Sequence, residues 1–178
     1  RKAGVPAPDS FQVRVQRNGR FFSIANLTEQ IDEEFLSRRS LDPNGALYKM
    51  YNTGTSSTSG VRKQTRKEES NEDLRKLVTG LRKRGWQGDA FVFDNLDVPK
   101  IINYWAAGTL IQDFDRTSKN WYLYRDTNHT GEWQILPWDK DLTFGLMSLQ
   151  TDDIRGNHDS ATRGTSKVGH PFFGIYED

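Results

Sequence analysis

The sequence predicts an α+β fold, because it carries the signals of two β-hairpins with helices between them. Residues 11–15 alternate apolar and polar side chains, as a half-buried strand does, and Asn18-Gly19 supplies the positive φ angles of a tight hairpin turn. Two further strand-like runs, 121–124 and 133–136, flank a second turn. Residues 97–111 repeat apolar side chains at helical spacing. We therefore expect one domain over residues 1–178.

The first half of the chain alternates short elements with turn signals. Polar residues rich in Gly, Pro, Asn and Ser separate the apolar runs, which limits each element to a few residues. The expected elements after the first turn are a returning strand over 21–27, a helix over 33–39 that buries Phe35 and Leu36, a turn over 42–45, a strand over 46–51 and an exposed loop over 53–60.

Two longer helices are predicted in the middle of the chain. Ser70 and Asp73 approximate a capping box before a run with helical spacing of leucines. Asp97 is a good N-cap for the next helix, and Pro99 falls in its first turn, where the missing N–H costs nothing. The positions expected to face the core are Leu74, Leu77, Val78 and Leu81 in the first helix, and Ile101, Ile102, Trp105 and Ile111 in the second.

The composition excludes several classes of protein. The chain has no cysteine, which excludes disulfides, thiolate zinc sites and cysteine nucleophiles. Its net charge of +1 argues against nucleic acid as a partner, since that surface shows as a basic excess. The basic cluster at 62–67 is followed by Glu68 and Glu69 and is expected to be a solvated face. No apolar run approaches the roughly 20 residues that span a membrane.

Four oxygen-bearing side chains lie at the ends of the second hairpin. Asp115 and Asn120 precede its first strand, and Asp139 and Asp141 follow its second strand. Adjacent strands bring such ends together, and carboxylate and amide oxygens are the ligands of a hard divalent cation. The sequence therefore predicts a metal site here. Lys140 and Arg116 offer a competing explanation, in which they neutralise the two later carboxylates without any metal.

Other conspicuous residues have simpler expected roles. Trp121, Tyr122 and Tyr124 alternate along a strand, which is typical of core and cross-strand packing rather than of a base-stacking platform. His129 is expected to be exposed in the turn. His158 and His170 have no partner at metal-ligand spacing, so the sequence predicts no zinc site there. Asp113 is expected to cap or ion-pair within its loop, with a metal role secondary.

A long helix, then Asp-x-x-x-x-Asn, then a hairpin, then a carboxylate beside a glycine is the order of parts in the catalytic half of protein kinases. More particularly, the sequence over residues 1–146 resembles the CotH kinase family of spore-coat-type proteins. The stretches that carry the resemblance are FFS at 21–23, EQID at 29–32, YWAA at 104–107, KNWYLYRD at 119–126 and PWDKDLTFG at 137–145.

The resemblance implies an atypical protein-kinase-like fold, mainly its catalytic lobe, and transfer of phosphate from ATP to Ser or Thr of coat or surface proteins with Mg²⁺ or Mn²⁺. By position, Asp115 looks like the catalytic-loop base and Asn120 like its metal-holding partner. Asp139 looks like the later metal-binding Asp, with Asp141 the competing choice. Asp139 is preferred because the apolar run before it ends directly on it.

The resemblance also places the nucleotide contacts. Glu29, Gln30 and Asp32 fall where the adenine-facing hinge lies, after a hairpin and before a helix. Lys49, with Glu72 as its partner, is a candidate for the phosphate-binding lysine, although it follows the hinge rather than preceding it. In kinase order the Gly-rich strands, that lysine and its helix all come first. We therefore expect a fragment that lacks the N-terminal nucleotide-clamping part.

Two other functions compete with a kinase of the CotH type. Some relatives in the resembled family are surface ligands of host cells, which favours a catalytically silent adhesion or scaffold module. A metal-dependent hydrolase using the same carboxylates is a third reading. The resemblance implies an extracytoplasmic location, such as the cell surface or spore coat, although this chain carries no targeting signal. The oligomeric state is left open.

Overall fold

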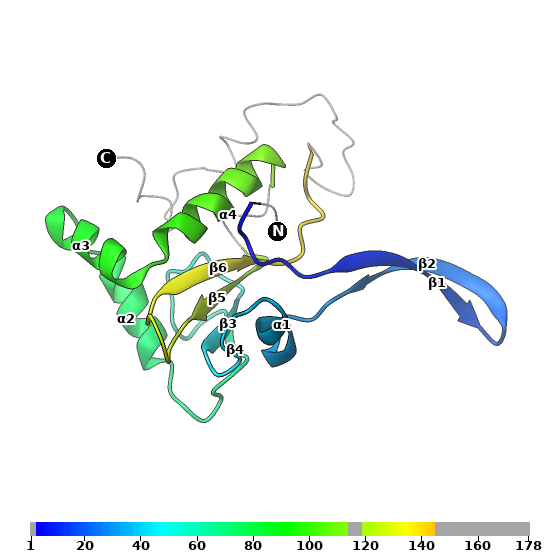
Figure 1. Cartoon of the computed structure of the whole chain (residues 1–178), viewed down its shortest axis with the longest axis horizontal. Helices are drawn as coiled ribbons and strands as arrows, with labels where there is room; N and C mark the ends of the chain where they lie inside the picture. Colours follow the sequence, from blue (N-terminus) through cyan, green and yellow to red (C-terminus); the bar gives the residue numbers. More distant parts are fainter. Residues whose placement is uncertain (1–2, 114–118, 145–178) are drawn as a thin grey trace.

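The structure is a computed structural model that describes residues 3–113 and 119–144. It consists of a body built on a four-stranded antiparallel sheet and a two-stranded arm that projects from it (Figure 1). This arrangement confirms the predicted α+β class. The arm pairs β1 (Ser10–Arg17) with β2 (Arg20–Thr28), and the body sheet has the order β4 (Val61–Lys63), β3 (Ala46–Met50), β5 (Trp121–Arg125), β6 (Trp133–Pro137).

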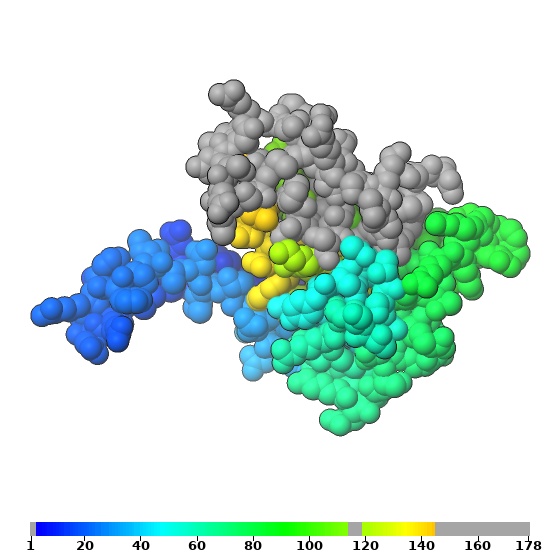
Figure 2. All heavy atoms as spheres, turned by 180° about the vertical axis from the view of Figure 1, so that it is seen from behind, coloured from blue at the N-terminus to red at the C-terminus, as the bar shows by residue number. Residues whose placement is uncertain are grey.

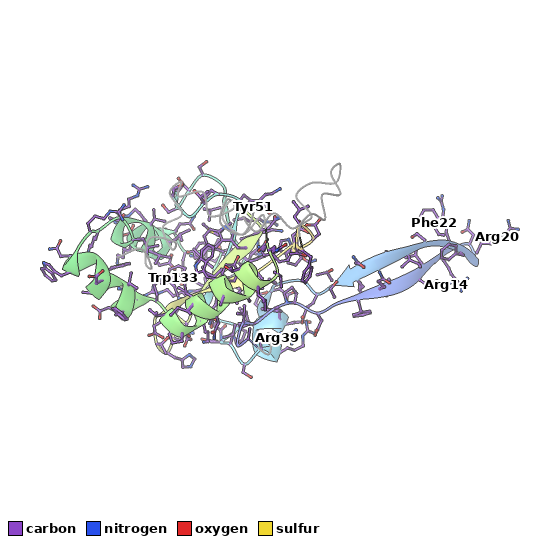
Figure 3. The ribbon with its side chains drawn as sticks, turned by 90° about the horizontal axis from the view of Figure 1, so that it is seen from above. Arg14, Arg20, Phe22, Arg39, Tyr51 and Trp133 are labelled. Carbon is purple, nitrogen blue, oxygen red and sulfur yellow. The ribbon has the colours of Figure 1, made fainter. Side chains whose placement is uncertain are left out.

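The arm is a two-stranded hairpin that extends away from the body (Figure 2). Asn18 and Gly19 have φ angles of 52° and 76°, so the predicted type of turn is confirmed. Arg14, Arg20 and Phe22 lie near the tip, far from the helices (Figure 3). Each cross-strand pair places its two side chains on the same face, and on one face the pairs Phe11–Leu27 and Val13–Ala25 are wholly apolar. That face carries Phe11, Val13, Val15, Phe21, Ala25 and Leu27, of which Phe11 and Phe21 are each 58% exposed.

An ion-pair cluster fixes the arm to the body at its base. Glu29 follows β2, and its side chain is only 9% exposed. The carboxylate lies 2.7 Å from the Arg39 guanidinium and 2.6 Å from that of Arg38, and it accepts a hydrogen bond of 2.8 Å from the backbone N–H of Asp9. Arg39 also contacts the Asp9 carboxylate at 3.0 Å. Both arm strands are thereby tied to the helix α1 (Glu33–Arg38).

The body sheet is buried on both faces, because each face is covered by helices. One face packs Tyr48, Trp121 and Leu123 against α2 (Glu72–Gly80) and α4 (Val98–Leu110). The other face packs Leu47 and Tyr124 against α1. The side chains predicted to be buried in this second layer, Phe35 and Leu36, are completely buried. Successive side chains of β5 therefore point alternately into the two core layers. Trp121, Tyr122 and Tyr124 are core residues as predicted.

The start of α4 agrees with the sequence. The Asp97 side chain accepts a hydrogen bond from the Lys100 N–H at 3.2 Å, and proline lies in the first turn. Ile101 and Trp105 are buried as expected, but Ile102 is 45% exposed, so its assignment to the core was wrong. Ile102 turns out of the apolar stripe because consecutive helical residues point about 100° apart. No described helix is both long and apolar enough to cross a bilayer.

Three features of the body differ from the sequence prediction. The N-cap of α2 is Asn71 rather than Ser70, and no side chain caps this helix. Asp73 is used elsewhere: it accepts a hydrogen bond of 2.5 Å from the Tyr48 hydroxyl. Helix α3 (Trp86–Asn95) and strand β4 were not predicted. In α3 no residue is fully buried, so it lacks the apolar stripe that reveals a helix, and β4 has only three residues.

Candidate functional site

The two strand ends predicted to carry the site lie side by side. The N–H of Trp138, after β6, donates to the Asn120 carbonyl, before β5, at 3.1 Å. The Asn120 side-chain amide donates in turn to the Asp139 carbonyl at 3.3 Å. Asn120 and Asp139 have φ angles of 63° and 52°, a left-handed conformation that Asn and Asp tolerate better than other non-glycine residues. The start of β5 and the end of β6 therefore lie at the same end of the sheet.

A buried ion pair joins this end of the sheet to the C-terminal end of α4. The Asp113 side chain is 2% exposed, and its carboxylate lies 2.8 Å from the Lys140 ammonium. The Asp113 N–H donates to the Gly108 carbonyl, and the Phe144 N–H donates to the Ile111 carbonyl. The ammonium also lies over the Tyr104 ring. The segment 139–141 is therefore held against the C-terminal end of α4.

This ion pair changes the electrostatic interpretation of the two later carboxylates. Lys140 pairs with Asp113 and not with either of its own neighbours, so Asp113 forms an ion pair, but with a partner outside its own loop. Within 3–113 and 119–144, neither Asp139 nor Asp141 forms an ion pair, and both side chains are exposed. Arg116, the other cation of the competing explanation, lies outside the described residues. The described part thus leaves two negative charges facing solvent.

A cavity of about 380 Å³ opens beside these carboxylates. It lies between the end of β6 and the base of the arm, so it is bordered by parts of the chain more than a hundred positions apart. Its two sides are formed by Ala7, Pro8, Ser10, Asn26 and Thr28 from the arm and by Pro137, Trp138, Asp139, Lys140 and Asp141 from the strand end. The cavity offers room for a ligand next to both predicted metal-binding aspartates.

Lys49 lies on the body sheet near the same strand end. Its ammonium is 4.7 Å from the centre of the Trp138 ring, and two tyrosine rings, Tyr51 and Tyr122, lie 5.5 and 5.6 Å away. Cation–π contacts at this range stabilise a lysine without a carboxylate. Its expected partner was wrong: the Glu72 carboxylate pairs with Arg75 at 2.6 Å. Burial raises the pKa of the Tyr122 hydroxyl to about 12, so this ring stays neutral.

The residues predicted at the hinge have structural partners. Glu29 holds the arm through two arginines. The Asp32 side chain caps α1, accepting from the Phe35 N–H at 3.0 Å. Gln30 is exposed. Asp115, the predicted catalytic base, lies outside the described residues, between Asp113 and Asn120. A role of these four residues in binding or catalysis stays a prediction.

A second polar cluster lies at the opposite end of the β5–β6 hairpin. One ligand-type atom each from Asp42, Asp126 and His129 lies within 4.8 Å of the others. The His129 Nδ1 is 2.8 Å from the Asp126 carboxylate and 4.0 Å from that of Asp42. Sequence spacing did not reveal this cluster, because Asp42 precedes the other two residues by more than eighty positions. The exposure predicted for His129 is confirmed, since its side chain is 65% exposed.

The cluster predicts a pH dependence. The hydrogen bond to Asp126 raises the pKa of the His129 imidazole above 6.5. Protonated His129 therefore stabilises the fold at pH values below 6.5, and this contribution is lost as the pH rises through the folded-state pKa. An NMR titration of His129 is expected to give a midpoint above 6.5 that falls toward 6.5 in Asp126→Asn. A midpoint at or below 6.5 in the unmodified chain contradicts this.

The chain matches proteins of one family. The family model described as CotH kinase protein matches residues 1–171. The Inner spore coat protein H of Bacillus subtilis (strain 168) is 25% identical over 158 residues, which cover 80% of this chain. The chain spans 43% of the length of that relative, less than half.

Proposed function

The chain belongs to the CotH kinase family, and from that premise we propose that it is the catalytic part of an atypical, ATP-dependent protein kinase. Its acceptors are Ser or Thr hydroxyls of coat or surface proteins. The observation that carries the proposal is the junction of Asn120 with Asp139 beside a cavity bordered by two exposed carboxylates. Phosphoryl transfer depends mainly on positioning and charge neutralisation, which such a junction can supply.

The donor set fits a hard divalent cation. Asn120 supplies an amide oxygen, and Asp139 and Asp141 supply carboxylates without an ion-pair partner among the described residues. These are the ligand types that Mg²⁺ or Mn²⁺ takes, together with phosphate oxygens. When bound there with the nucleotide, the cation supplies neutralisation of the phosphate charge. Among the two carboxylates we propose Asp139 as the principal ligand, because its backbone is hydrogen-bonded directly to Asn120.

The protein's own groups then have distinct tasks. We propose that the Asp115 carboxylate accepts the proton of the acceptor hydroxyl while that oxygen attacks the γ-phosphorus of ATP. The bond from the γ-phosphorus to the bridging oxygen breaks, and ADP leaves with the electron pair. The ion pair of Asp113 with Lys140 supports this arrangement, because it holds one end of the segment that contains Asp115 against the segment that contains Asp139.

Nucleotide contacts are proposed for Lys49 and for three residues of the predicted hinge, all of them outside the lining of the cavity. The Lys49 ammonium lies 4.7 Å from the centre of the Trp138 ring, and Trp138 directly precedes Asp139. A phosphate bound near Asp139 is therefore attracted by the positive charge of Lys49. Glu29, Gln30 and Asp32 remain proposed hinge residues, contacting the nucleotide through backbone groups where the side chains of Glu29 and Asp32 are engaged. The apolar face of the arm is exposed. We therefore also propose that further residues of the full-length protein pack on this face and complete the part that holds the nucleotide.

The kinase-like fold and an extracytoplasmic location belong to the same proposal. The relative's name places that protein in an inner spore coat, which supports coat proteins as partners. The chain spans less than half of that relative, so the activity is proposed for the whole protein that contains this chain.

The test is nucleotide binding and transfer by the full-length protein. We expect ATP with Mg²⁺ at a hundred times Kd to stabilise the protein by about 2.7 kcal/mol. With ATP labelled at its γ-phosphate, we expect the label to appear on a Ser or Thr side chain. Asp139→Asn is expected to remove the metal-dependent part of the shift, and Asp141→Asn to reduce it less. Asp94→Asn, an exposed carboxylate on α3, is the matched control. A shift that is unchanged in Asp139→Asn contradicts the assignment.

The second candidate is a catalytically silent adhesion or scaffold module. The exposed apolar face of the arm favours it, because contiguous exposed apolar surface marks interaction sites. A full-length protein that binds neither ATP nor a divalent cation at the Asp139 site, and yet is folded, would decide for this module.

A further inference from the structure

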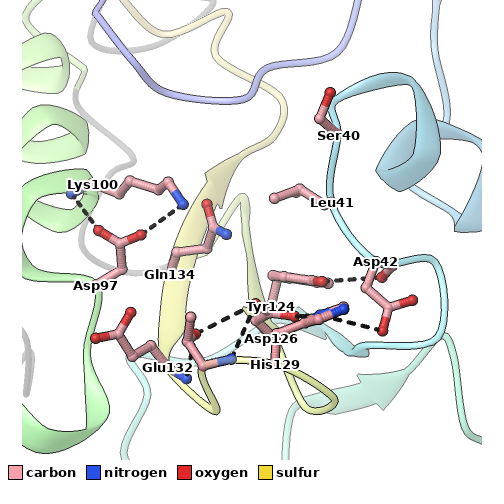
Figure 4. Close-up of a pocket in the computed structure, with 11 residues that line it drawn as sticks. Ser40, Leu41, Asp42, Asp97, Lys100, Tyr124, Asp126, His129, Glu132 and Gln134 are labelled. Carbon is pink, nitrogen blue, oxygen red and sulfur yellow. Dashed lines mark hydrogen bonds and ion pairs between the residues drawn. The ribbon is translucent and has the colours of Figure 1, made fainter.

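A second cavity, of about 320 Å³, lies beside the turn that joins β5 to β6. Its lining includes the cluster of Asp42, Asp126 and His129, together with Glu132 and Gln134 (Figure 4). The proposed phosphotransfer residues do not reach it. Asn120 and Asp126 flank opposite ends of β5, a strand of five residues, and are therefore about 20 Å apart along an extended backbone.

One buried polar group in this cavity lacks a partner. Gln134 is 3% exposed, and its side-chain oxygen Oε1 is buried without a hydrogen bond from any of the described residues. An unsatisfied buried acceptor costs about 1–3 kcal/mol. The cost is removed when a donor, such as a water molecule held by a cation, occupies the cavity. Gln134 thus points to a ligand independently of the three clustered side chains.

The charges around the cavity favour a cation. Asp97 is already neutralised by Lys100, whose ammonium lies 2.6 Å from its carboxylate. Asp42 and Asp126 place two negative charges beside His129, and Glu132 adds a third to the lining of the cavity. Asn128 donates to the Asp42 carboxylate at 2.6 Å and the Asn44 N–H donates to it at 2.9 Å, which fixes this carboxylate in place. Asp42 is therefore held in position before any ion arrives.

We propose that Asp42, Asp126 and His129 bind a divalent transition-metal ion of the zinc or manganese type. Two carboxylates and one imidazole form a mixed oxygen and nitrogen donor set, which suits Zn²⁺ or Mn²⁺ better than Mg²⁺ or Ca²⁺. Ligands of one tetrahedral ion at about 2.1 Å lie about 3.4 Å apart. The atoms of the cluster already lie within 4.8 Å, so small side-chain rotations bring them to that spacing.

The ion links two parts of the chain that are distant in sequence. Asp42 opens the turn before β3, and Asp126 and His129 belong to the turn between β5 and β6. On binding, His129 gives up its hydrogen bond to Asp126 and its proton, so the metal replaces a proton as the positive charge between the carboxylates. The site is structural in character: it holds the β5–β6 turn against the β3 turn.

The experiment titrates the 178-residue chain with ZnCl₂ and, separately, with MnCl₂ and MgCl₂ at pH 7.5, by calorimetry. The titration contains no nucleotide, whose phosphates complete the proposed Asp139 site. We therefore expect one site for Zn²⁺ or Mn²⁺, and an affinity for Mg²⁺ at least tenfold weaker. Asp126→Asn and His129→Gln are each expected to weaken binding at least tenfold. Glu132→Gln removes a charge from the same cavity but not a member of the cluster, and it is expected to change the affinity less than threefold.

Three controls make each outcome decisive. Circular dichroism establishes that the variants are folded. The visible absorption of bound Co²⁺ reports the coordination of the ion, and we expect it to change in His129→Gln. The double variant His158→Gln, His170→Gln tests the histidines outside the described residues. The absence of binding by Zn²⁺ and Mn²⁺, equal losses in Glu132→Gln and Asp126→Asn, or loss of binding in the double variant overturns the proposal. None of these outcomes affects the Asp139 site.

Discussion

Asp115→Asn in the full-length protein is expected to lower the rate of phosphoryl transfer by about 10²–10⁴-fold, which is the usual contribution of a positioned general base. Asparagine keeps the size of the side chain and can accept a hydrogen bond, but it cannot take the proton of the acceptor hydroxyl. Binding of ATP with Mg²⁺ is therefore expected to persist. The measurement is single-turnover transfer from labelled ATP, beside a thermal-shift titration with the same nucleotide.

The ratio of the two readouts separates a base from a metal ligand. A base variant loses transfer and keeps the thermal shift, whereas a metal-ligand variant such as Asp139→Asn loses both. Transfer within threefold of the unmodified protein would remove Asp115 from the mechanism. Loss of both readouts, with the fold intact, would move Asp115 to the metal-binding group.

Asp113→Asn, two positions earlier, is expected to act on stability. It removes the carboxylate that lies 2.8 Å from the Lys140 ammonium, in a pair where Asp113 is 2% and Lys140 16% exposed. Breaking a buried pair by removing one partner costs about 3–5 kcal/mol, because the remaining charge stays desolvated. Against the 5–15 kcal/mol that stabilises a typical domain, this is a large loss. Urea unfolding of the 178-residue chain measures it as a lower midpoint with an unchanged slope.

A matched pair on the surface provides the control. Glu72 and Arg75 lie at a similarly short distance, 2.6 Å, but their side chains are 46% and 60% exposed. Because solvent screens such a pair, Glu72→Gln is expected to leave the midpoint nearly unchanged. Lys140→Met added to Asp113→Asn is expected to restore part of the lost stability, since it removes the buried charge. Equal midpoints for Asp113→Asn and Glu72→Gln would show that the ion pair does not hold the two segments together.

The elements that the sequence predicted correctly are those specified by local chemistry. Asn18 and Gly19 tolerate positive φ, so the arm turns where these two residues stand. Asp97 caps α4 through its own side chain, and Pro99 fits the first turn. By contrast Ser70 satisfies the capping pattern, yet the N-cap of α2 is Asn71 and no side chain caps the helix. The Asp73 carboxylate instead accepts a hydrogen bond from the Tyr48 hydroxyl, 25 positions earlier. Tertiary contacts overrode the local signal there.

The features of the candidate site likewise fall into those that the sequence predicted and those that depend on tertiary contacts. The sequence indicated that Asn120 and Asp139 end two adjacent strands, because the turn between those strands is short and its residue types are recognisable. It did not indicate that Lys140 would pair with Asp113, nor that Glu29 would be held by Arg38 and Arg39. Which partner a charge finds depends on the packing of whole helices, and spacing along the chain does not encode that.

The amino-acid sequence by itself determined the family, the α+β class, the arm and the ends of β5 and β6, since each follows from motifs or from contacts between near neighbours. Only the tertiary structure decided that Asp139 and Asp141 face a cavity under the arm, and that Asp42 lies beside His129. The physical reason is that these arrangements join segments separated by eighty or more residues. Their proximity results from burying both faces of one sheet, where the register of β3 against β5 sets which loops meet.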